Sequence, residues 1–478
     1  MHSSQNPAAE LFATVVANGC CIGCGACAVF DPGIRIKLDD YGRYVATRQG
    51  GDSPANPAAA RVCPFADGVP DENKLASEIF GQNGSFEPHV GHHVATYAGW
   101  VVESDFRAQG SSGGLASWLL VELLERGVVD HVVHVAPQPA LTAGAPLFGF
   151  AISSTPEEVR AKAKSRYYPV EMSGVISEIL QRPGRYAVVG IPCFIKALRL
   201  ACRESAVLKE RLAFTVGIVC GHLKSTAFAE MLAWQCGIAP SELRAIDFRT
   251  KLPGRAAFSY AVTVAGGRDG KPLTVTRPVS ELFGSNWGHG FFKYKACDFC
   301  DDVVGETADI SIGDAWLREY ASDSAGTNVV VVRSPALNAI LADAADAGRL
   351  HLDSIPVEKV VESQARGFRH RRNGLAYRLL LEDEAGRWRP TKRVRPMVGR
   401  LTQKLREIYA IRYELGQVSH AAFAAAKAKQ DFSIFLQAMN PLTTRHDRYC
   451  RRPLILRILG KLKRKFMALA APTVRLHF

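Results

Sequence analysis

The chain has 478 residues, too many for one small hydrophobic core, and this length predicts two to four domains. Hydrophobic residues make up 47% and charged residues 22%, as in ordinary globular proteins. The sequence contains no apolar run of about 18 residues, so it predicts no membrane-spanning helix. The N-terminus lacks the pattern of a secretory signal, and twelve cysteines in such a chain favour metal or redox chemistry over disulfides. We therefore expect a cytoplasmic protein.

The net charge of +13 is unevenly distributed along the chain. Residues 1–360 hold 33 Lys and Arg against 38 Asp and Glu, whereas residues 361–478 hold 26 against 8. The basic character therefore belongs to a C-terminal extension. Nucleic-acid binding is disfavoured, because no motif that reads nucleic acid accompanies the charge.

Residues 1–90 show little periodicity and are predicted to form a small, loop-dominated domain organised by a metal. The stretch CCIGCGACAVFDP resembles a bacterial iron–sulfur run, except that Asp31 stands before Pro32 where the fourth cysteine would be. In two-cluster ferredoxins that fourth cysteine ligates the other cluster, so the nearer cluster needs a remote cysteine followed by proline. The sequence RVCPF supplies one, which completes a predicted [4Fe–4S] site made of Cys21, Cys24, Cys27 and Cys63.

A zinc site with four thiolates is the alternative for these cysteines. Cys20 is out of register with the spacing and is predicted not to be a ligand.

Residues 91–172 follow an α/β pattern in which residues 97–102 predict a strand, a helix ending at Gly127 follows, and residues 128–135 predict the next strand. The stretch AQGSSGGLASWLL lies between strand and helix. Its glycines would let the backbone approach a ligand closely, and Ser111 or Ser112 could cap the helix while free N–H groups bind phosphate. An ordinary capping turn is the alternative.

The stretch AKAKSRYYPV brings Lys162, Lys164 and Arg166 together with two tyrosines. Such a set suits the charge of a pyrophosphate and the stacking of a ring system. A solvated helix end is the alternative.

Residues 173–360 continue the pattern: apolar strands at 186–191 and 214–219 alternate with helices at 194–204 and 225–235. Residues 258–276 predict a hairpin, and residues 308–348 continue a mixed sheet. We therefore predict an α/β fold with a mixed sheet, preceded by a ferredoxin-like iron–sulfur domain.

A second cysteine set is scattered along this region. Cys193 and Cys220 each follow a predicted strand, so they are expected near the sheet edge where ligands bind, and Cys297 and Cys300 form a CxxC pair. A four-thiolate site is one interpretation; buried structural cysteines and a small zinc site are the other. The remaining cysteines are predicted to be packing or surface residues: Cys202, Cys236 and Cys450.

Residues 361–478 are predicted to form a basic, mainly helical extension, with a basic loop at 365–374. Near the end, apolar residues from Ile455 to Leu469 recur at helical spacing among basic residues. Such a helix could lie on the inner membrane surface, dock on an acidic partner, or pack on its own domain.

The order of these motifs resembles the family of coenzyme F420 hydrogenase and dehydrogenase beta subunits, which includes formate dehydrogenase beta subunits and ferredoxin-dependent chlorophyll-pathway reductases. The resemblance spans roughly residues 15–335. It implies an FAD protein with two [4Fe–4S] clusters, one of them close to the flavin.

Carried over by position, the resemblance implies FAD contacts at Gly110, Ser111, Ser112, Gly113, Gly114, Ser165, Arg166 and Tyr167, and inner-cluster ligands at Cys193, Cys220, Cys297 and Cys300. Two departures stand out. The N-terminal domain has one cluster motif where many relatives have two, and Phe194 stands where relatives often carry a polar residue.

Since clusters carry single electrons and FAD holds one or two, we expect an oxidoreductase that couples a ferredoxin-like donor or a deazaflavin coenzyme to two-electron chemistry on a small organic molecule. An electron-transfer protein that serves a partner subunit is the alternative, and a zinc-containing binding scaffold is a third hypothesis. No residue is identified as an acid or base. Asp314, Trp316 and His222 are candidate pocket residues for which a structural role is favoured.

Overall fold

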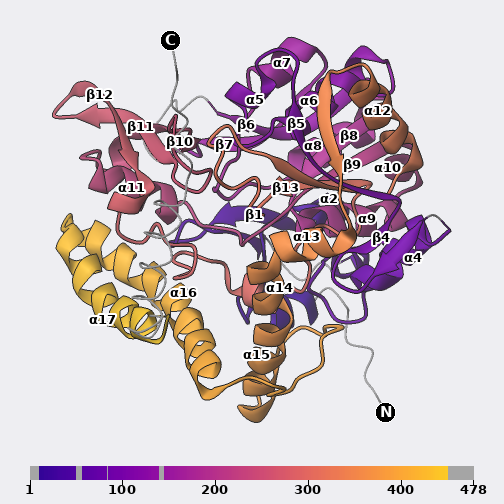
Figure 1. The fold of residues 1–478 in the computed structure, drawn as a ribbon. Helices are drawn as coiled ribbons and strands as arrows, with labels where there is room; N and C mark the ends of the chain where they lie inside the picture. The colour runs from indigo at the N-terminus through magenta and orange to yellow at the C-terminus, as the bar shows by residue number, and fades with distance from the viewer. Residues whose placement is uncertain (1–9, 50–55, 83, 139–144, 451–478) are drawn as a thin grey trace, which may run out of the picture.

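The computed structural model describes residues 10–49, 56–82, 84–138 and 145–450 (Figure 1). Its main element is an eight-stranded sheet. The strands are β5 (Ala95–Val101), β6 (His131–Pro137), β7 (Phe148–Ser153), β8 (Tyr186–Gly190), β9 (Leu212–Ile218), β13 (Ile310–Asp314), β14 (Asn328–Val332) and β15 (Leu350–Ser354), in the spatial order β15-β5-β14-β13-β9-β8-β6-β7. The four neighbouring strands β13, β9, β8 and β6 pair in parallel. The remaining pairings of the sheet, β15-β5, β5-β14, β14-β13 and β6-β7, are antiparallel. The predicted mixed sheet is confirmed.

Helices cover both faces of this sheet. Val132 and Ala187 join the core under one helical layer, whereas their chain neighbours Val133 and Val188 join the core under the other, because successive strand side chains alternate between faces. Burial on both faces explains why these strands read as nearly continuous apolar runs. The first layer contains α5 (Phe106–Gln109), α6 (Leu115–Glu125), α7 (Pro156–Arg160) and α12 (Pro335–Asp346), and the second α8 (Ser173–Gln181), α9 (Pro192–Glu204) and α10 (Ala206–Arg211).

The predicted hairpin is present as β11 (Ala261–Arg268) and β12 (Lys271–Pro278), joined at Asp269 and Gly270, which both have positive φ. With β10 (Leu243–Thr250) it forms a separate antiparallel sheet, packed beside α11 (Ala227–Gln235). Short 3-10 turns η2 (Pro240–Glu242), η3 (Val279–Glu281) and η4 (Lys295–Phe299) connect this region.

The N-terminal region consists of short elements and loops that pack on α8 and α9. They are the π-helix η1 (Phe12–Val16), α2 (Ala26–Phe30), the hairpin β1 (Ile34–Leu38) and β2 (Tyr44–Arg48), α3 (Ala58–Arg61) and α4 (Glu72–Phe80), followed by β3 (Ser85–Glu87) and β4 (Gly91–His93). These short elements are joined by loops, and the ferredoxin-like character expected of this region stays a prediction.

Through residue 450 the C-terminal extension is mainly helical, as predicted. It contains α13 (Val357–Ser363), α14 (Ala365–Arg371), α15 (Asn373–Glu384), α16 (Gln403–Lys429) and α17 (Phe432–Cys450), and α16 and α17 lie away from the large sheet (Figure 1). The predicted basic loop at 365–374 is wrong: these residues belong to α14 and α15, where Arg371 is fully buried among polar partners. The apolar positions from Ile455 to Leu469 lie outside the described residues. No helix of the described chain is both long and apolar enough to cross a membrane.

Candidate functional site

Cys21, Cys24, Cys27 and Cys63 come from the loop before α2, from α2 itself and from the turn after α3. Burial raises the pKa of the Cys24 thiol, and the nearby thiols of Cys63 and Cys21 raise it further. These three thiols therefore lie close together. All four are free of disulfides. Cys21 Sγ accepts hydrogen bonds of 3.4 Å from the N–H groups of Gly23 and Ala46.

The loop that carries these cysteines depends on glycine. Gly23 has φ +63°, and a Cβ there would lie 2.2 Å from the Tyr44 carbonyl oxygen. No other residue therefore fits without moving β2 away from the cysteines.

Asp31, at the position of the missing fourth cysteine, has a structural role. Its Oδ1 accepts from Gly33 N–H at 2.8 Å and its Oδ2 from Asn56 N–H at 3.0 Å, which joins two loops. Cys20 is buried, and burial raises the pKa of its thiol to about 12.

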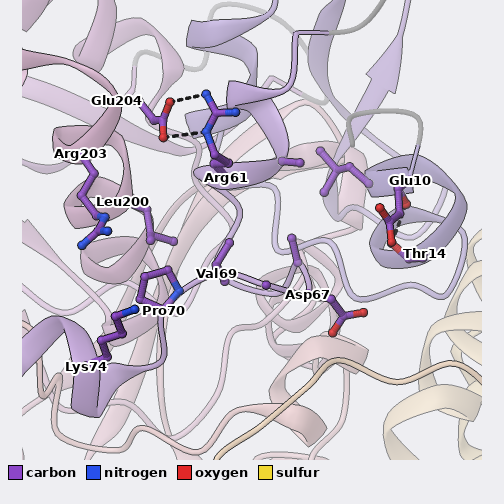
Figure 2. A pocket seen from close by; sticks show the side chains of 14 residues that line it. Glu10, Thr14, Arg61, Asp67, Val69, Pro70, Lys74, Leu200, Arg203 and Glu204 are labelled. Atoms are coloured by element: carbon purple, nitrogen blue, oxygen red, sulfur yellow. Dashed lines mark hydrogen bonds and ion pairs between the residues drawn. The ribbon is translucent and has the colours of Figure 1, made fainter. Parts of the chain in front are cut away.

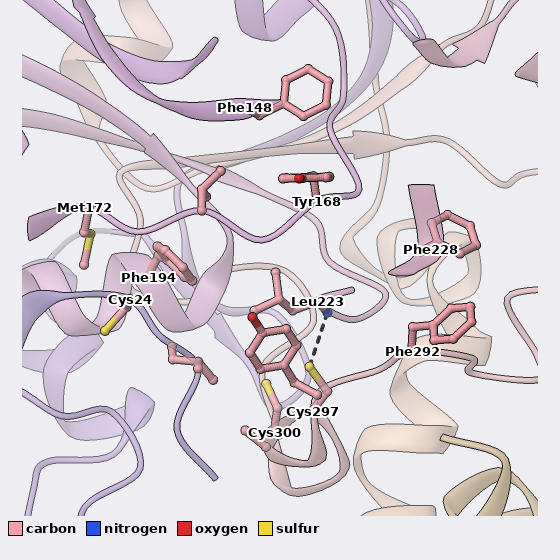
Figure 3. Close-up of a cluster of buried hydrophobic side chains, with 14 of the residues drawn as sticks. Cys24, Phe148, Tyr168, Met172, Phe194, Leu223, Phe228, Phe292, Cys297 and Cys300 are labelled. Atoms are coloured by element: carbon pink, nitrogen blue, oxygen red, sulfur yellow. Dashed lines mark hydrogen bonds between the residues drawn. The ribbon is translucent and has the colours of Figure 1, made fainter. Parts of the chain in front are cut away.

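The second cysteine set also converges. Cys193 lies in the first turn of α9 directly after β8, Cys220 lies just after β9, and Cys297 and Cys300 lie in and directly after η4. Burial raises the pKa of Cys193 well above its usual value, and Cys300, Cys220, Cys297 and then Cys24 of the first set raise it further. The two sets are therefore neighbours. Figure 3 shows Cys24, Cys297 and Cys300 within one buried cluster of side chains.

Two hydrogen-bond donors that the sequence did not identify contact this set, the backbone N–H of Leu223 and the side chain of Arg371. The Leu223 N–H donates to Cys297 Sγ at 3.2 Å (Figure 3). Arg371 of α14 donates from Nη1 to Cys300 Sγ at 2.5 Å, and from Nη2 to the carbonyl oxygens of Cys220 and Gly221 at 2.9 and 2.7 Å. Burial opposes the charge of Arg371, but the surrounding thiols hold its pKa above the usual value. A lone arginine in a basic stretch gave no signal for this contact.

A cavity of about 280 Å³ opens at the carboxyl ends of the parallel strands, the edge at which α/β sheets bind ligands. The glycine-rich loop, the 162–168 segment and the residues after β8, β9 and β13 line it. Seven of the eight residues predicted to contact FAD belong to its wall: Gly110, Ser111, Ser112, Gly114, Ser165, Arg166 and Tyr167. Cys220 belongs to the same wall, so the cavity and the second cysteine set share a boundary.

The glycine-rich loop serves the chain's own packing more than the sequence suggested. A Cβ at Gly113 would lie 2.7 Å from the Gly99 carbonyl oxygen, and one at Gly114, which has φ +86°, would lie 2.6 Å from that of Phe106. The predicted serine cap is wrong: Gly114 is the N-cap of α6, and the first N–H of the helix, that of Leu115, donates to Asn328 Oδ1 at 3.2 Å. Ser111 Oγ instead accepts from Ser165 N–H at 2.9 Å, and Ser112 Oγ donates to the Thr327 carbonyl at 3.0 Å.

Arg249 of β10 organises the wall from behind, and the sequence gave no sign of it. Its guanidinium donates to Tyr167 Oη at 3.1 Å, to Asp314 Oδ2 at 3.0 Å and to the Ser111 carbonyl at 3.3 Å. Asp314 thus has the structural role that was favoured for it. Burial raises the pKa of Tyr167 to about 12.

Several polar atoms in the cavity wall have no protein partner. Arg166 Nε and His222 Nε2 are buried without a hydrogen bond. Lys224, fully buried, donates to the Phe291 carbonyl at 2.5 Å and lies over the rings of Phe228 and Trp287 at 4.5 and 4.9 Å, and burial lowers its pKa well below the usual value. The unpaired polar atoms and the Arg166 guanidinium suit an anionic, hydrogen-bonding ligand. Phe194 adds an apolar side chain to the wall.

A second cavity, of about 330 Å³, lies between the N-terminal region and α9 (Figure 2). Its charged side chains include the Arg61–Glu204 ion pair at 2.6 Å. None of the predicted cluster or FAD residues belongs to its wall as described. The predicted FAD residues therefore line the cavity beside Cys220 and not this one.

Comparison with known proteins agrees with this architecture. Residues 96–177 match the N-terminal part, and residues 184–358 the C-terminal part, of the coenzyme F420 hydrogenase/dehydrogenase beta subunit. A curated relative, one of the subunits of the F(420)H(2) dehydrogenase of Methanosarcina mazei, is 23% identical over 326 residues, which cover 64% of this chain and 79% of the relative.

A solved structure, the F420-reducing [NiFe] hydrogenase complex from Methanosarcina barkeri, contains a chain with 18% identity and a TM-score of 0.45, covering 60% of this chain and 92% of that one. The two family matches together span more than half of the sequence. The chain therefore belongs to the family of coenzyme F420 hydrogenase/dehydrogenase beta subunits, which are redox electron-transfer subunits.

Proposed function

We propose that this chain is an iron–sulfur FAD oxidoreductase that couples a one-electron carrier, or a reduced deazaflavin, to two-electron redox of a small organic molecule. One observation carries the proposal: Cys220 of the second cysteine set and the predicted FAD residues Ser111 and Tyr167 belong to the wall of one cavity. A cluster bound by Cys220 would thus adjoin the flavin.

The residues of the cavity fit a flavin dinucleotide. Arg166, whose Nε is buried without a hydrogen bond, supplies positive charge for the pyrophosphate, and Tyr167, held by Arg249, presents an aromatic ring whose orientation is fixed. Bound there, FAD supplies chemistry that accepts or donates either one or two electrons. The protein's part is to orient the ring system, to exclude water and to set the potential.

The two cysteine sets fit [4Fe–4S] clusters in the chemistry of their donors. Each set offers four sulfurs that are not in disulfides, and burial raises the pKa of Cys63 and Cys297 to about 12. Buried thiols with such pKa values become thiolates only beside a strong positive charge, which a metal centre provides. The proximity of Cys24 to Cys193 supports a path from the first set to the second and then to the cavity.

The zinc alternative fits less well. A zinc tetrathiolate with Zn–S bonds of about 2.3 Å holds its sulfurs about 3.8 Å apart. Among the described residues, the group of ligand atoms that lie within 4.8 Å of one another contains no cysteine of either set. The sulfurs of each set are therefore spaced more widely than around a single zinc ion, which supports iron–sulfur clusters, since several iron atoms separate the thiolates there.

The alternative function, an electron-transfer subunit without its own substrate, has support from the name of the curated relative, which is itself one subunit of an F(420)H(2) dehydrogenase. Both functions need the same cofactors in the same order. They differ in whether the purified chain alone turns over a small molecule.

The deciding experiment compares electron entry in anaerobic wild-type protein and in Cys220→Ala. Reduced deazaflavin should reduce the flavin of both proteins, whereas a one-electron donor such as reduced methyl viologen should reduce the flavin quickly only in the wild type. Cys236→Ala, which removes a buried cysteine outside both sets, is the matched control. Equal viologen rates in wild type and Cys220→Ala, or the absence of flavin from the wild type, would refute the proposal.

To separate the two functions, the wild type is then supplied with reduced donor and a panel of small acceptors, with and without a copurifying partner. Turnover by the chain alone supports an enzyme. Turnover that requires the partner supports the electron-transfer role.

A further inference from the structure

A compact group of metal-ligating side chains lies where the C-terminal extension meets the family region, outside both cysteine sets. His289 comes from the loop between η3 and η4, and His446 and Asp447 come from the last turns of α17. One ligand atom of each lies within 4.8 Å of the others. Asp447 Oδ1 is 3.0 Å from His289 Nε2 and 2.9 Å from His446 Nδ1.

These two distances are close to those of a tetrahedral metal site. With Zn–N and Zn–O bonds of about 2.0–2.2 Å, ligand atoms around zinc lie about 3.3–3.5 Å apart, so Asp447 would move away from each histidine by only a few tenths of an ångström. Two imidazoles and one carboxylate are a donor set that zinc accepts readily. Cys450, one helical turn after His446, is not part of this group: its Sγ lies nearest to the other ring nitrogen of His446, at 3.5 Å from Nε2.

Both histidines are buried. Their two rings meet edge to face with centroids 5.0 Å apart. The Asp447 carboxylate between them would offset part of the charge of a divalent ion, whereas Arg412 of α16 is a nearby positive group that a metal would have to tolerate.

We propose that His289, His446 and Asp447 bind a zinc ion. The site joins α17 to a loop of the family region 158 residues earlier in the chain. Since the extension also supplies Arg371 to the second cysteine set, zinc at this position would hold the extension in place without taking part in redox chemistry.

The test is zinc analysis and zinc K-edge X-ray absorption on the full chain, purified anaerobically and passed over a weak chelator. We expect about one zinc per chain, with nitrogen and oxygen neighbours at about 2.0–2.1 Å and at most one sulfur at about 2.3 Å. Asp447→Asn, which keeps the side-chain shape, should lower zinc affinity at least tenfold and leave the iron content unchanged. Glu414→Gln is the matched control, because it removes a carboxylate that pairs with Arg445 on the same two helices, at 3.1 Å.

Three results would overturn the proposal: no zinc in the wild type after added zinc is offered, an all-sulfur shell around the zinc, or undiminished zinc in Asp447→Asn. If Asp447→Asn does not fold, the neighbours of zinc in the wild type decide the question alone. Iron and flavin contents are measured on the same samples, so a failure here is distinct from a failure of the proposed redox function.

Discussion

Replacing Arg371 by methionine tests whether the C-terminal extension controls the second cluster. Arg371 is fully buried, donates to Cys300 Sγ at 2.5 Å, and binds three backbone carbonyls, those of Asp302, Cys220 and Gly221. A positive charge and a hydrogen bond at a ligand sulfur stabilise a cluster more when it has gained an electron. Arg371→Met should therefore lower the reduction potential of this cluster.

The magnitude follows from the contact. A hydrogen bond to a charged group contributes about 1.5–3 kcal/mol. If half of this contribution is present only in the reduced cluster, the hydrogen bond stabilises the reduced form by about 0.7–1.5 kcal/mol. For a one-electron couple this corresponds to a fall of about 30–65 mV in the reduction potential when the arginine is replaced. The change also leaves three buried carbonyls without their donor, so the variant should melt at a lower temperature than the wild type.

The assay is a redox titration followed by electron paramagnetic resonance, which distinguishes the two clusters. Arg371→Lys should give an intermediate potential, since the charge stays but the forked geometry is lost. Arg366→Met, an exposed arginine on the same helix, is the control and should leave the potential unchanged. An unchanged potential in Arg371→Met with full iron content would refute the reasoning.

Further predictions concern the first cluster, the loop before α6 and a cavity histidine. Cys24→Ala should lose about half of the iron, whereas Cys20→Ala should keep all of it; equal losses would contradict the assignment of ligands. Gly114 has φ +86°, and a Cβ there would lie 2.6 Å from the Phe106 carbonyl oxygen, so Gly114→Ala should lower the unfolding free energy by about 1–3 kcal/mol and reduce bound flavin. Gly174→Ala, with open space around its Cβ, is the control and should change neither. Equal flavin contents in the two variants would refute this role of Gly114. Burial lowers the pKa of His134 to about 4, below the value of about 6.5 in the unfolded chain, so the unfolded state binds more protons between these values and stability rises with pH across that window. From about pH 5.5 to about pH 7.5 the unfolding free energy of His134→Gln should therefore rise by about 1 kcal/mol less than that of the wild type, and its melting temperature should rise less as well. An identical rise in both proteins would show that the histidine is not buried in its neutral form.

The sequence was sufficient for the parts of the fold that local patterns determine. The apolar run of β8, the helix that ends before Gly127 and the turn at Asp269 and Gly270 all depend on hydrophobic period or turn chemistry within a few residues. The convergence of Cys193 and Cys220 was also predictable, because both follow parallel strands whose ends share one edge.

The rest depends on contacts that no local pattern encodes. Arg249 reaches Ser111 across 138 residues, and Arg371 reaches Cys300 across 71. Both were unremarkable basic residues in the sequence, and the segment around Arg371 was predicted to be a basic loop because its buried partners lie elsewhere in the chain. The close packing at Gly113 and Gly114 could not be predicted either, since the backbone that excludes a side chain there comes from β5 and α5.

The most direct test of the central claim is the iron, acid-labile sulfide, zinc and flavin content of the anaerobically purified chain. Two [4Fe–4S] clusters, of which the second adjoins one flavin, predict about eight iron atoms, about eight sulfides and one FAD per chain. Tetrathiolate zinc in place of iron, with no flavin, would contradict the account.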